Sequence, residues 1–329
     1  MSRVEDKRLL IIARAKLNLT LDILGRRPDG YHELESVVQS IDLYDGVALG
    51  STPAHRVSGQ GRELGVTLAC QNPLVPLGQE NLAFKAALAL SRHVGVGAAV
   101  WIDIKKRIPV SAGLGGGSAD AAAVLLGLNE LWGLGLDDAE LAAIGETVGA
   151  DVPFCLTGGT GVIRGKGEKI ERLPALENVW FVVVVPEGGI STAEAYAAYD
   201  RLSADESDSA TQVGGGGGPR AGCATPAMIR AVAEHDLRRV VSGISNDLER
   251  AAATMVPSVR DAKKALLEAG ALGVGMSGSG PAVFGIAEDE RTAREIRRIV
   301  REAYDTTFVC CSSPTGLESI SVRHWKRRD

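Results

Sequence analysis

The sequence predicts a two-domain chain that combines helices with strands, of the α/β or α+β class. Its 329 residues exceed the span of one typical domain, roughly 100–200 residues. Apolar residues make up 45% of the chain but aromatic residues only 4%, so Ala, Val, Leu and Ile must build the cores. Segments with the alternating pattern of strands are interspersed with segments of helical period.

The first half of the chain predicts strands with helices between them. Residues 9–24 alternate polar and apolar side chains, as in a strand with one buried face and one face available for chemistry. After a Pro-Asp-Gly turn, residues 37–43 predict a further extended segment. Helical patterns cover 80–95 and 137–148, and a strand at 99–110 runs into a glycine-rich loop.

A change of character near residues 165–174 divides the chain into domains 1–168 and 169–329. The continuous apolar run at 179–187 predicts a central strand of a second sheet. Residues 203–222 are poor in apolar side chains and include five consecutive glycines. This composition predicts a mobile surface excursion without a packed core.

The bulk composition limits the partners and the location of the protein. A net charge of −5 argues against a nucleic-acid footprint, which needs a basic face. Five cysteines without a CxxC spacing predict reduced thiols. The apolar run at 9–13 is too short for a signal peptide, and no window approaches 18 apolar residues. We therefore expect a soluble cytoplasmic protein.

The glycine-rich loop follows the strand that ends near residue 110. It contains Gly113, Gly115, Gly116 and Gly117. Glycines allow positive φ and a close approach of the backbone to a ligand. Ser118 is predicted to cap a helix over 119–132, whose first amides carry a partial positive charge. Loop and helix start together predict a phosphate cradle; the alternative is a tight turn whose glycines serve packing. The role of Asp120 stays open.

A second glycine cluster, Gly273 to Gly278, satisfies the dinucleotide pattern GxGxxG literally. That fingerprint should follow a strand and open a helix. Here a predicted helix ends before it, near Ala269, and residues 281–287 after it read as a strand. The order of elements therefore argues against a dinucleotide oxidoreductase. It favours a glycine turn that closes on a ligand or on the first domain.

Three stretches carry a family resemblance: "ARAKLNLTLDILGRRPDGYHELESV", "IPVSAGLGGGSADAAA" and "GVGMSGSGPAVFGI". Together, and in this order, they resemble the three motifs of the GHMP kinase superfamily. The resemblance covers nearly the whole chain apart from residues 203–222. It implies an α+β fold of two lobes, an N-terminal domain of the ribosomal-protein-S5-like type and a C-terminal ferredoxin-like domain. The active site would lie between them.

The combination of "AKLNL", "DGYH", "GLGGGSADAA", "GADVPF" and "SNDLE" is most similar to one branch of that family. The branch phosphorylates the tertiary 2-hydroxyl of a cytidyl diphosphate polyol in the non-mevalonate route to isoprenoids. The resemblance implies ATP as phosphate donor, with Mg²⁺. It also implies a small-molecule substrate as the partner, with no nucleic acid and no membrane. We expect a monomer or a weak homodimer.

Two residues match the catalytic pair of the family. Asp151 in "GADVPF" corresponds to the catalytic aspartate, the expected general base. Its alternative is an ordinary helix cap ahead of Pro153. Lys16 in "AKLN" corresponds to the catalytic lysine, which can pair with Asp151 and steady the charge of the transferring phosphoryl group.

The resemblance also assigns substrate contacts. Asn18 lies two residues after Lys16, so on a strand both side chains point the same way, and the family uses this position near the reacting hydroxyl. Tyr31 and His32 match the pair that recognises cytosine, and Tyr196 would supply the other side of a base sandwich. From local sequence alone, Tyr31 and His32 are residues that flank a turn.

ATP contacts come from the glycine loop and its surroundings. The expected ATP-binding residues are Asn81, Pro109, Gly113, Leu114, Gly115, Gly116, Gly117 and Ser118. Asn81 would lie near the adenine, or else cap a helix. Asn246 could form a capping box with Glu249. The third motif contributes Gly275, Ser277, Gly278 and Gly280. No carboxylate cluster has metal-ligand spacing, so no protein-built metal site is predicted, and Mg²⁺ would be held largely by phosphates.

Two rival functions share these motifs. A kinase of the same fold could act on mevalonate, homoserine or a sugar, and Tyr31 with His32 argues against this because a small alcohol has no use for them. A nucleotide-sensing protein without catalysis could also use the scaffold. The presence of both Lys16 and Asp151 counts against that reading.

Overall fold

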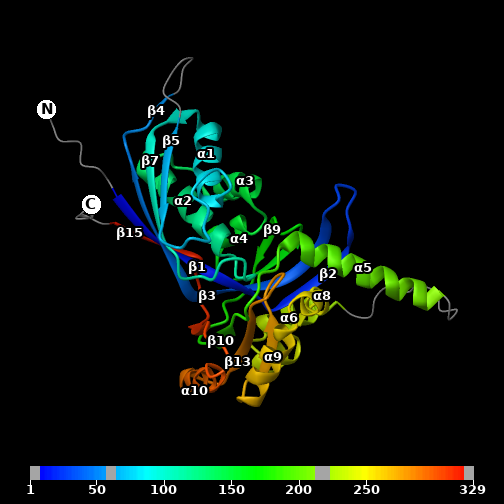
Figure 1. The fold of residues 1–329 in the computed structure, drawn as a ribbon. Coiled ribbons are helices and arrows are strands. Elements are labelled where there is room, and N and C mark those ends of the chain that lie inside the picture. The colour runs from blue at the N-terminus through cyan, green and yellow to red at the C-terminus, as the bar shows by residue number, and fades with distance from the viewer. Residues whose placement is uncertain (1–7, 57–63, 212–222, 322–329) are drawn as a thin grey trace.

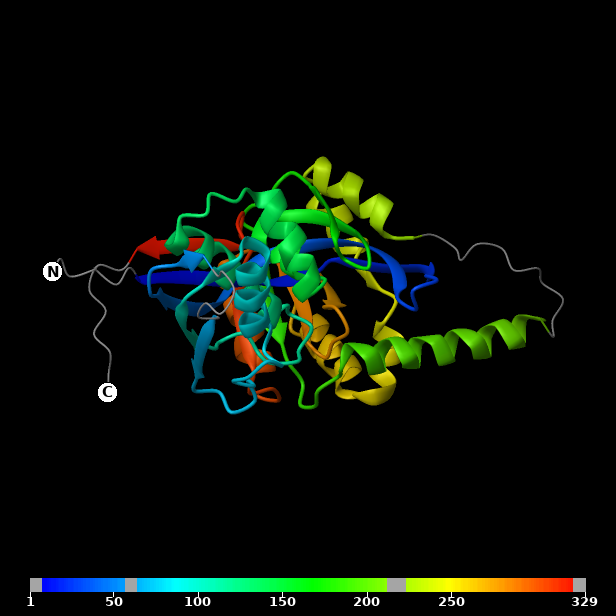
Figure 2. The ribbon, with the colours of Figure 1, turned by 90° about the horizontal axis from the view of Figure 1, so that it is seen from above.

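A computed structural model describes residues 8–56, 64–211 and 223–321. The described chain forms two lobes, each built on a mainly antiparallel sheet, which confirms the predicted α+β fold (Figure 1). Figure 2 shows the chain ends 8 and 321 lying together on one side of the molecule. No helix in the described ranges has the length and hydropathy to span a membrane.

The first lobe is built on a nine-stranded sheet in which β3 is the central member. Its path is β11-β2-β3-β1-β15, while β7 and β8 also pair with β3 and carry β5 and β9 at their outer sides. The strands are β1 Arg8–Asn18, β2 Thr20–Arg26, β3 His32–Ser51, β5 Gly65–Cys70, β7 Ala99–Lys105, β8 Thr160–Gly165, β9 Lys169–Arg172, β11 Ser245–Asn246 and β15 Leu317–Ser321. A separate pair joins β4 His55–Arg56 to β6 Val96–Gly97.

Strand β3 is much longer than the predicted extended segment at 37–43. It runs for 20 residues, pairing with β2 and β8 at its beginning and with β7 at its end. The polar side chains of Ser36, Gln39 and Asp45 are buried along it. Hydrogen bonds to other parts of the chain satisfy these side chains. Because these residues are polar yet buried, the segment lacks the simple polar–apolar alternation that marks a strand.

The helices of this lobe are α1 Leu82–Val94, α2 Gly116–Trp132, α3 Asp138–Val148 and α4 Val152–Thr157. Helices α1, α2 and α4 contact the sheet, and α3 packs on these three helices. Helix α1 ends at Gly95 as predicted, in the left-handed conformation (φ 66°). Helix α3 begins with a capping box between Asp137 and Glu140. Helix α2 is buried along most of its length, which fixes the position of the glycine loop in front of it.

The second lobe contains a four-stranded antiparallel sheet in the order β12-β13-β10-β14. Its strands are β10 Trp180–Val184, β12 Gly273–Met276, β13 Val283–Ala287 and β14 Thr307–Cys311. With α9 Ser258–Glu268 and α10 Glu290–Val300, the chain order is β10-α9-β12-β13-α10-β14, the β-α-β-β-α-β pattern of ferredoxin-like folds. Strand β10 is central, as its apolar run predicts.

The GxGxxG match is a strand–turn–strand unit. Helix α9 precedes it, its first glycines lie in β12, and β13 follows. A helix start is thus absent where a dinucleotide fingerprint requires one. The rejection of a dinucleotide-binding site at these glycines is confirmed.

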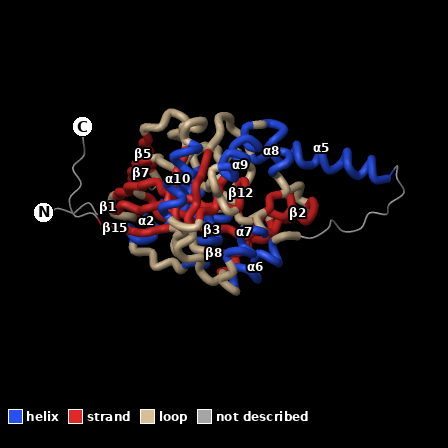
Figure 3. The backbone as a smooth tube through the Cα atoms, turned by 90° about the horizontal axis from the view of Figure 1, so that it is seen from below, coloured by secondary structure: helices blue, strands red, loops and turns tan. Residues whose placement is uncertain are grey.

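The remaining helices lie on the second lobe and along its boundary with the first, where α6 (Thr225–Ala233) contacts β2 and β3 (Figure 3). They are α5 Thr192–Thr211, α6 Thr225–Ala233, α7 Leu237–Ser242 and α8 Glu249–Met255. The far end of α5 extends away from the other elements in Figures 1 and 2. Residues 203–211 of the predicted excursion therefore belong to a helix, and residues 212–222 lie outside the described ranges. The mobility of this segment stays a prediction.

The two lobes share strands and a core. Strands β9, β11 and β15, all after residue 168, pair with strands of the first sheet, and the predicted division at residue 168 stays a prediction. One apolar cluster joins Leu17 and Ile41 of the first lobe to Phe181 and Phe284 of the second. The two phenylalanine rings meet edge to face, with centroids 6.0 Å apart. This shared core holds the lobes in a fixed relation around the site between them.

Candidate active site

A cavity of about 940 Å³ opens between the two lobes. It is lined by the end of β1, the turn after β2, the glycine loop, the start of α4, the start of α5 and the turn between β12 and β13. The sequence-predicted residues that line it are Lys16, Asn18, Tyr31, His32, Gly113, Gly115, Gly116, Gly117, Ser118, Asp151 and Tyr196. Residues separated by up to 180 positions thus meet in one cavity.

Lys16 lies at the centre of the polar contacts. Its Nζ donates a hydrogen bond to Asn18 Oδ1 (2.6 Å) and lies 3.5 Å from Asp151 Oδ2. Asn18 is fixed in turn, because its Nδ2 donates to Ser36 Oγ (2.8 Å). The lysine side chain is 6% exposed and the aspartate side chain 34%. The ammonium is therefore held rigidly, while the carboxylate beside it remains open to the cavity.

Two glycines make room for the lysine. A Cβ at Gly115 would lie 2.9 Å from Lys16 Cγ, and a Cβ at Gly278 would lie 3.3 Å from Lys16 Nζ. Both glycines have positive φ, 72° and 55°. The Lys16 amide also donates to the Leu114 carbonyl (3.0 Å). The glycine loop and the third motif thus enclose the lysine from two sides.

Asp151 occupies the N-cap position of α4, but its side chain does not cap the helix. Its backbone is helical (φ −84°, ψ −10°) and its carboxylate makes no capping hydrogen bond. The carboxylate instead faces Lys16. Asp151 therefore lies at the cap position that the alternative predicted, but its side chain does not cap the helix and is available for chemistry.

Helix α2 begins earlier than predicted. Its N-cap is Gly115, so the predicted cap at Ser118 and the predicted start at residue 119 are wrong. The left-handed backbone of Gly115 turns the chain into the helix directly beside Lys16. The first intrahelical donor to the cap carbonyl is the Ala119 amide (2.9 Å). The amides of Gly116, Gly117 and Ser118 precede it and are available to an anion at the cavity wall.

The third motif is tied to the second. Ser277 Oγ donates to the Gly113 carbonyl (2.9 Å), and a Cβ at Gly113 would lie 2.1 Å from the Ser277 carbonyl oxygen. Asn246 Nδ2 donates to the carbonyls of Met276 (2.8 Å) and Gly278 (2.9 Å). The proposed capping box of Asn246 with Glu249 is wrong, because the asparagine clamps this turn instead.

Of the third motif, Gly278 and Ser279 line the cavity. Gly275 lies in β12, Ser277 is fully buried, and Gly280 turns the chain with φ 79°. Gly278 and Ser279 therefore form part of the cavity wall, and the other residues of the motif hold these two in place.

An aromatic group forms the other end of the cavity. His32 stacks on Tyr196 with ring centroids 4.7 Å apart, and its Nε2 lies 2.7 Å from Asp200 Oδ1. Tyr31 is 61% exposed, with Lys166 Nζ 5.8 Å from its ring centre. Burial raises the pKa of the Tyr196 phenol. Because its ring stacks on the imidazole, Tyr196 supports His32 on this face.

Three expected ATP contacts do not line the cavity. Asn81 caps α1, since its Oδ1 accepts from the Ala83 amide (2.8 Å) and its Nδ2 donates to the Pro76 carbonyl (2.8 Å). Leu114 is buried, and its carbonyl holds the Lys16 amide. Pro109 is half-buried at the entrance to the glycine loop. The local alternative for Asn81, a helix cap, is what the structure shows.

Several residues of the cavity wall escaped the sequence reasoning. They include Arg26, Ser111, Lys166, Thr192 and Ser279. Lys166 sits between Gly165 and Gly167 in the turn from β8 to β9, a pattern that could have marked an exposed functional lysine. Arg26 has no such signal, because only the fold brings the end of β2 to this wall.

Two domain models of one family match the chain. GHMP kinases N terminal domain matches residues 81–159, and GHMP kinases C terminal matches residues 228–306. A 4-diphosphocytidyl-2-C-methyl-D-erythritol kinase of Gloeobacter violaceus is 44% identical over 313 residues, which are 94% of this chain and 96% of that protein.

The chain belongs to the GHMP kinase family.

Further relatives agree with this. A protein of Pelotomaculum thermopropionicum with the same name is 45% identical over 91% of this chain and 96% of its own. The crystal structure of a 4-(cytidine 5'-diphospho)-2C-methyl-D-erythritol kinase has a TM-score of 0.70 at 33% identity, covering 92% of this chain and 98% of that one. A homoserine kinase from Cytophaga hutchinsonii has a TM-score of 0.72 at 20% identity and shares the fold. This GHMP kinase is an ATP-dependent small-molecule kinase.

Metal-binding clusters are missing from the described part of this kinase: no group of three or more His, Cys, Asp or Glu there could hold an ion. The hydroxyl of Ser118, which does not cap α2, and the carboxylate of Asp151 are oxygens available at the cavity wall. Both suit a hard cation that also takes phosphate oxygens and water.

A buried charge cluster lies beneath the glycine loop of the kinase. Lys106 Nζ contacts both Asp45 Oδ2 and Asp120 Oδ2 at 2.6 Å. Asp45 Oδ1 also accepts from the amides of Arg107 and Ile108 at the loop entrance. A Cβ at Gly116 would lie 3.0 Å from Lys106 Nζ. The cluster thus anchors the loop from below and gives Asp120 its role.

The cluster holds two acids for one base. Burial, helped by the neighbouring Asp45 charge and opposed by Lys106, raises the pKa of Asp120 to about 7. Asp120 Oδ1 is buried without a hydrogen-bond partner in the described structure, which a neutral carboxyl group tolerates better than a carboxylate. The protonated form of Asp120 is therefore favoured below neutral pH.

We predict that Asp120→Asn flattens the pH dependence of stability. Between its ordinary pKa of 3.8 and about 7, folded Asp120 keeps a proton that the unfolded chain has lost. The free energy of unfolding of the wild type therefore falls as pH rises through this window, by on the order of 1 kcal/mol per pKa unit. Asparagine carries no such proton, so urea unfolding at pH 5 to 8 should show the variant gaining stability relative to the wild type as pH rises.

Asp138→Asn is the matched control, because Asp138 is an exposed acid at the start of α3. It should leave the wild-type pH dependence unchanged. An Asp120→Asn protein that loses the same stability at every pH would show that Asp120 acts only as an ionised partner of Lys106.

Proposed function

We propose that this kinase transfers the γ-phosphoryl group of ATP to the 2-hydroxyl of 4-diphosphocytidyl-2-C-methyl-D-erythritol, giving the 2-phosphate and ADP. Relatives named as kinases of this substrate share 44% and 45% identity over more than nine-tenths of the chain. The single observation that carries the proposal is the cavity itself. It has a lysine–carboxylate pair near its middle and a tyrosine–histidine pair at one end.

Asp151 is proposed as the general base. Its carboxylate is the open member of the central pair and can accept the proton of the 2-hydroxyl as the O–P bond forms. Lys16, held by Asn18, lies 3.5 Å from that carboxylate and fixes its position. The same ammonium offers a positive charge to the oxygens of the phosphoryl group during its transfer.

The start of α2 is proposed to hold the phosphates of ATP. The amides of Gly116, Gly117 and Ser118 point out of a helix N-terminus whose dipole favours anions. Mg²⁺ bound with ATP would neutralise phosphate charge. Ser118 and Asp151, which line the cavity, are the residues whose side-chain oxygens would hold it. Asn81 would influence the ATP site by capping α1, since both polar atoms of its side chain already make hydrogen bonds within the protein.

The aromatic end is proposed to bind the cytosine. Tyr31 presents an open ring face for stacking. His32 is oriented by Asp200: an Nε2–H that donates to this carboxylate leaves Nδ1 free to accept from the exocyclic amine of the base. Arg26 and Lys166 add positive charge to the wall nearby, which suits the diphosphate of the substrate.

A coupled ADP-release assay tests the substrate. We expect turnover with 4-diphosphocytidyl-2-C-methyl-D-erythritol and values of kcat/KM lower by at least about 10³ with mevalonate, homoserine and galactose, since these leave the base-binding end unfilled. Comparable turnover of any small alcohol would identify a different member of the family. ATP hydrolysis that no acceptor stimulates would favour a nucleotide-sensing role.

Asp151→Asn should lower kcat by about 10² or more, because the amide keeps the shape of the carboxylate but cannot accept the proton. ATP affinity, measured by calorimetry on the same preparation, should stay near the wild-type value. Asp138→Asn, an exposed substitution of the same kind, should leave both quantities unchanged. Turnover like that of the wild type in Asp151→Asn would remove Asp151 from the mechanism.

Tyr31→Ala should raise KM for the cytidyl substrate by about tenfold, since a stacked ring contributes roughly 0.5–1.5 kcal/mol, with little change in KM for ATP. Tyr31→Phe keeps the ring and should behave like the wild type. If both KM values rise equally, Tyr31 holds the shape of the turn rather than the base.

A further inference from the structure

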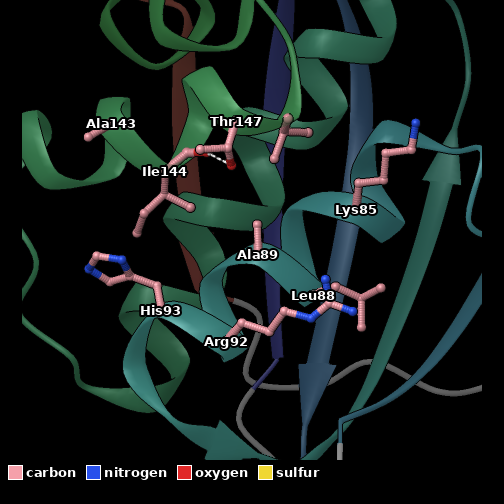
Figure 4. A pocket seen from close by; sticks show the side chains of 9 residues that line it. Lys85, Leu88, Ala89, Arg92, His93, Ala143, Ile144 and Thr147 are labelled. Carbon is pink, nitrogen blue, oxygen red and sulfur yellow. Dashed lines mark hydrogen bonds between the residues drawn. The ribbon is translucent and has the colours of Figure 1, made fainter.

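A second cavity, of about 660 Å³, lies between the outer faces of α1 and α3 (Figure 4). None of the residues that line it also lines the active-site cavity. Its volume falls within the range of small-molecule sites, roughly 300–1,000 Å³. It is thus a separate feature of the first lobe that the proposed kinase reaction does not use.

The cavity combines an apolar floor with a basic wall. Leu88, Ile144 and Val148 contribute apolar surface, and Lys85 and Arg92 contribute two cations from the same face of α1. Figure 4 shows Ile144 of α3 facing α1, with the Arg92 side chain lying near Leu88. Such a floor suits a ring or an alkyl body, and such a wall suits an anionic group.

The two cations have no acidic partner. Within the described ranges, neither Lys85 nor Arg92 takes part in an ion pair or side-chain hydrogen bond. The nearby acids of α3 are engaged elsewhere: Glu140 closes the capping box, and Glu146 lies 3.4 Å from Lys166. In a chain of net charge −5, this leaves a local positive site open to an external anion.

The helix dipole accounts for one cation only. Arg92 lies in the last turn of α1, where the dipole favours positive charge. Lys85 lies in the first turn, where the same dipole disfavours it, and that turn contains no acid. The helix dipole therefore does not account for Lys85, and an anion in the cavity would offset the unfavourable position of this charge.

We propose that the α1–α3 cavity is a binding site for a phosphorylated small molecule with an apolar or aromatic body. The phosphate lies against Lys85 and Arg92, and the body lies on Leu88 and Ile144. Thr147 adds a hydroxyl to the same wall. A phosphate suits a basic wall better than a carboxylate does, because it carries more charge and offers three oxygens.

Both helices lead to the active site. Leu82, the first residue of α1, lines the active-site cavity, and the C-cap of α3, Gly149, lies two residues before Asp151. A ligand that sets the spacing of α1 and α3 therefore acts on elements that position the general base. This gives the site a direct structural connection to the kinase reaction.

Phenyl phosphate is the probe, with phenol and inorganic phosphate as its two halves. Calorimetry on the full chain measures affinity, and amide chemical shifts locate the site. We expect saturable binding of phenyl phosphate that is tighter than that of either half, with shifts in α1 and α3. The variant Lys85→Gln with Arg92→Gln should bind about tenfold more weakly.

The control variant, Lys264→Gln with Arg291→Gln, removes two exposed cations from the second lobe and should bind like the wild type. Thermal unfolding midpoints of both variants verify that they fold. No saturable binding, an unchanged affinity in Lys85→Gln/Arg92→Gln, or shifts confined to the active-site cavity would overturn the proposal. If inorganic phosphate bound as tightly as phenyl phosphate, the proposal would also fail, because the apolar floor would contribute nothing to binding.

Discussion

The position of the Lys16 ammonium is the constraint on which the rest of the structure depends. A buried cation is tolerated only when acceptors surround it, and here Asn18 and Asp151 supply them. The aliphatic part of the side chain needs space, which Gly115 and Gly278 leave by having no Cβ. The conformations of both glycine motifs follow from this packing, and so does the place where α2 begins.

This packing couples the lobes. Ser277 holds the glycine loop through the Gly113 carbonyl, and Asn246 holds the turn that carries Ser277. The shared core of Phe181 and Phe284 lies behind them. The middle of the cavity is consequently a rigid frame. Its aromatic end is built differently, from a turn and from the first part of α5, where Tyr31 is largely exposed.

Two lysines near the same loop have opposite situations. Lys106 has two buried carboxylates, so the cluster has an excess of negative charge and raises the pKa of Asp120 to about 7. Lys16 has one partly open carboxylate and faces a cavity. Lys106 is thus fully enclosed by protein partners and anchors the loop, whereas Lys16 faces the cavity and can also contact a ligand. Local sequence does not separate them, because each lysine lies on or next to a strand with apolar neighbours.

The sequence by itself determined the central strand β10, the ends of α1 and α3 and the order of elements around "GVGMSG", because periodicity and caps are local. The family motifs also named Lys16 and Asp151. Only the tertiary structure decided that Ser118 is no cap, that Asn246 clamps a turn, that Asn81 caps a helix and that Arg26 reaches the cavity. The physical reason is that clamps and cavity walls depend on partners distant in the chain, and that whether a polar side chain caps a helix depends on what else packs around it. A polar side chain can bond near or far, and packing selects which.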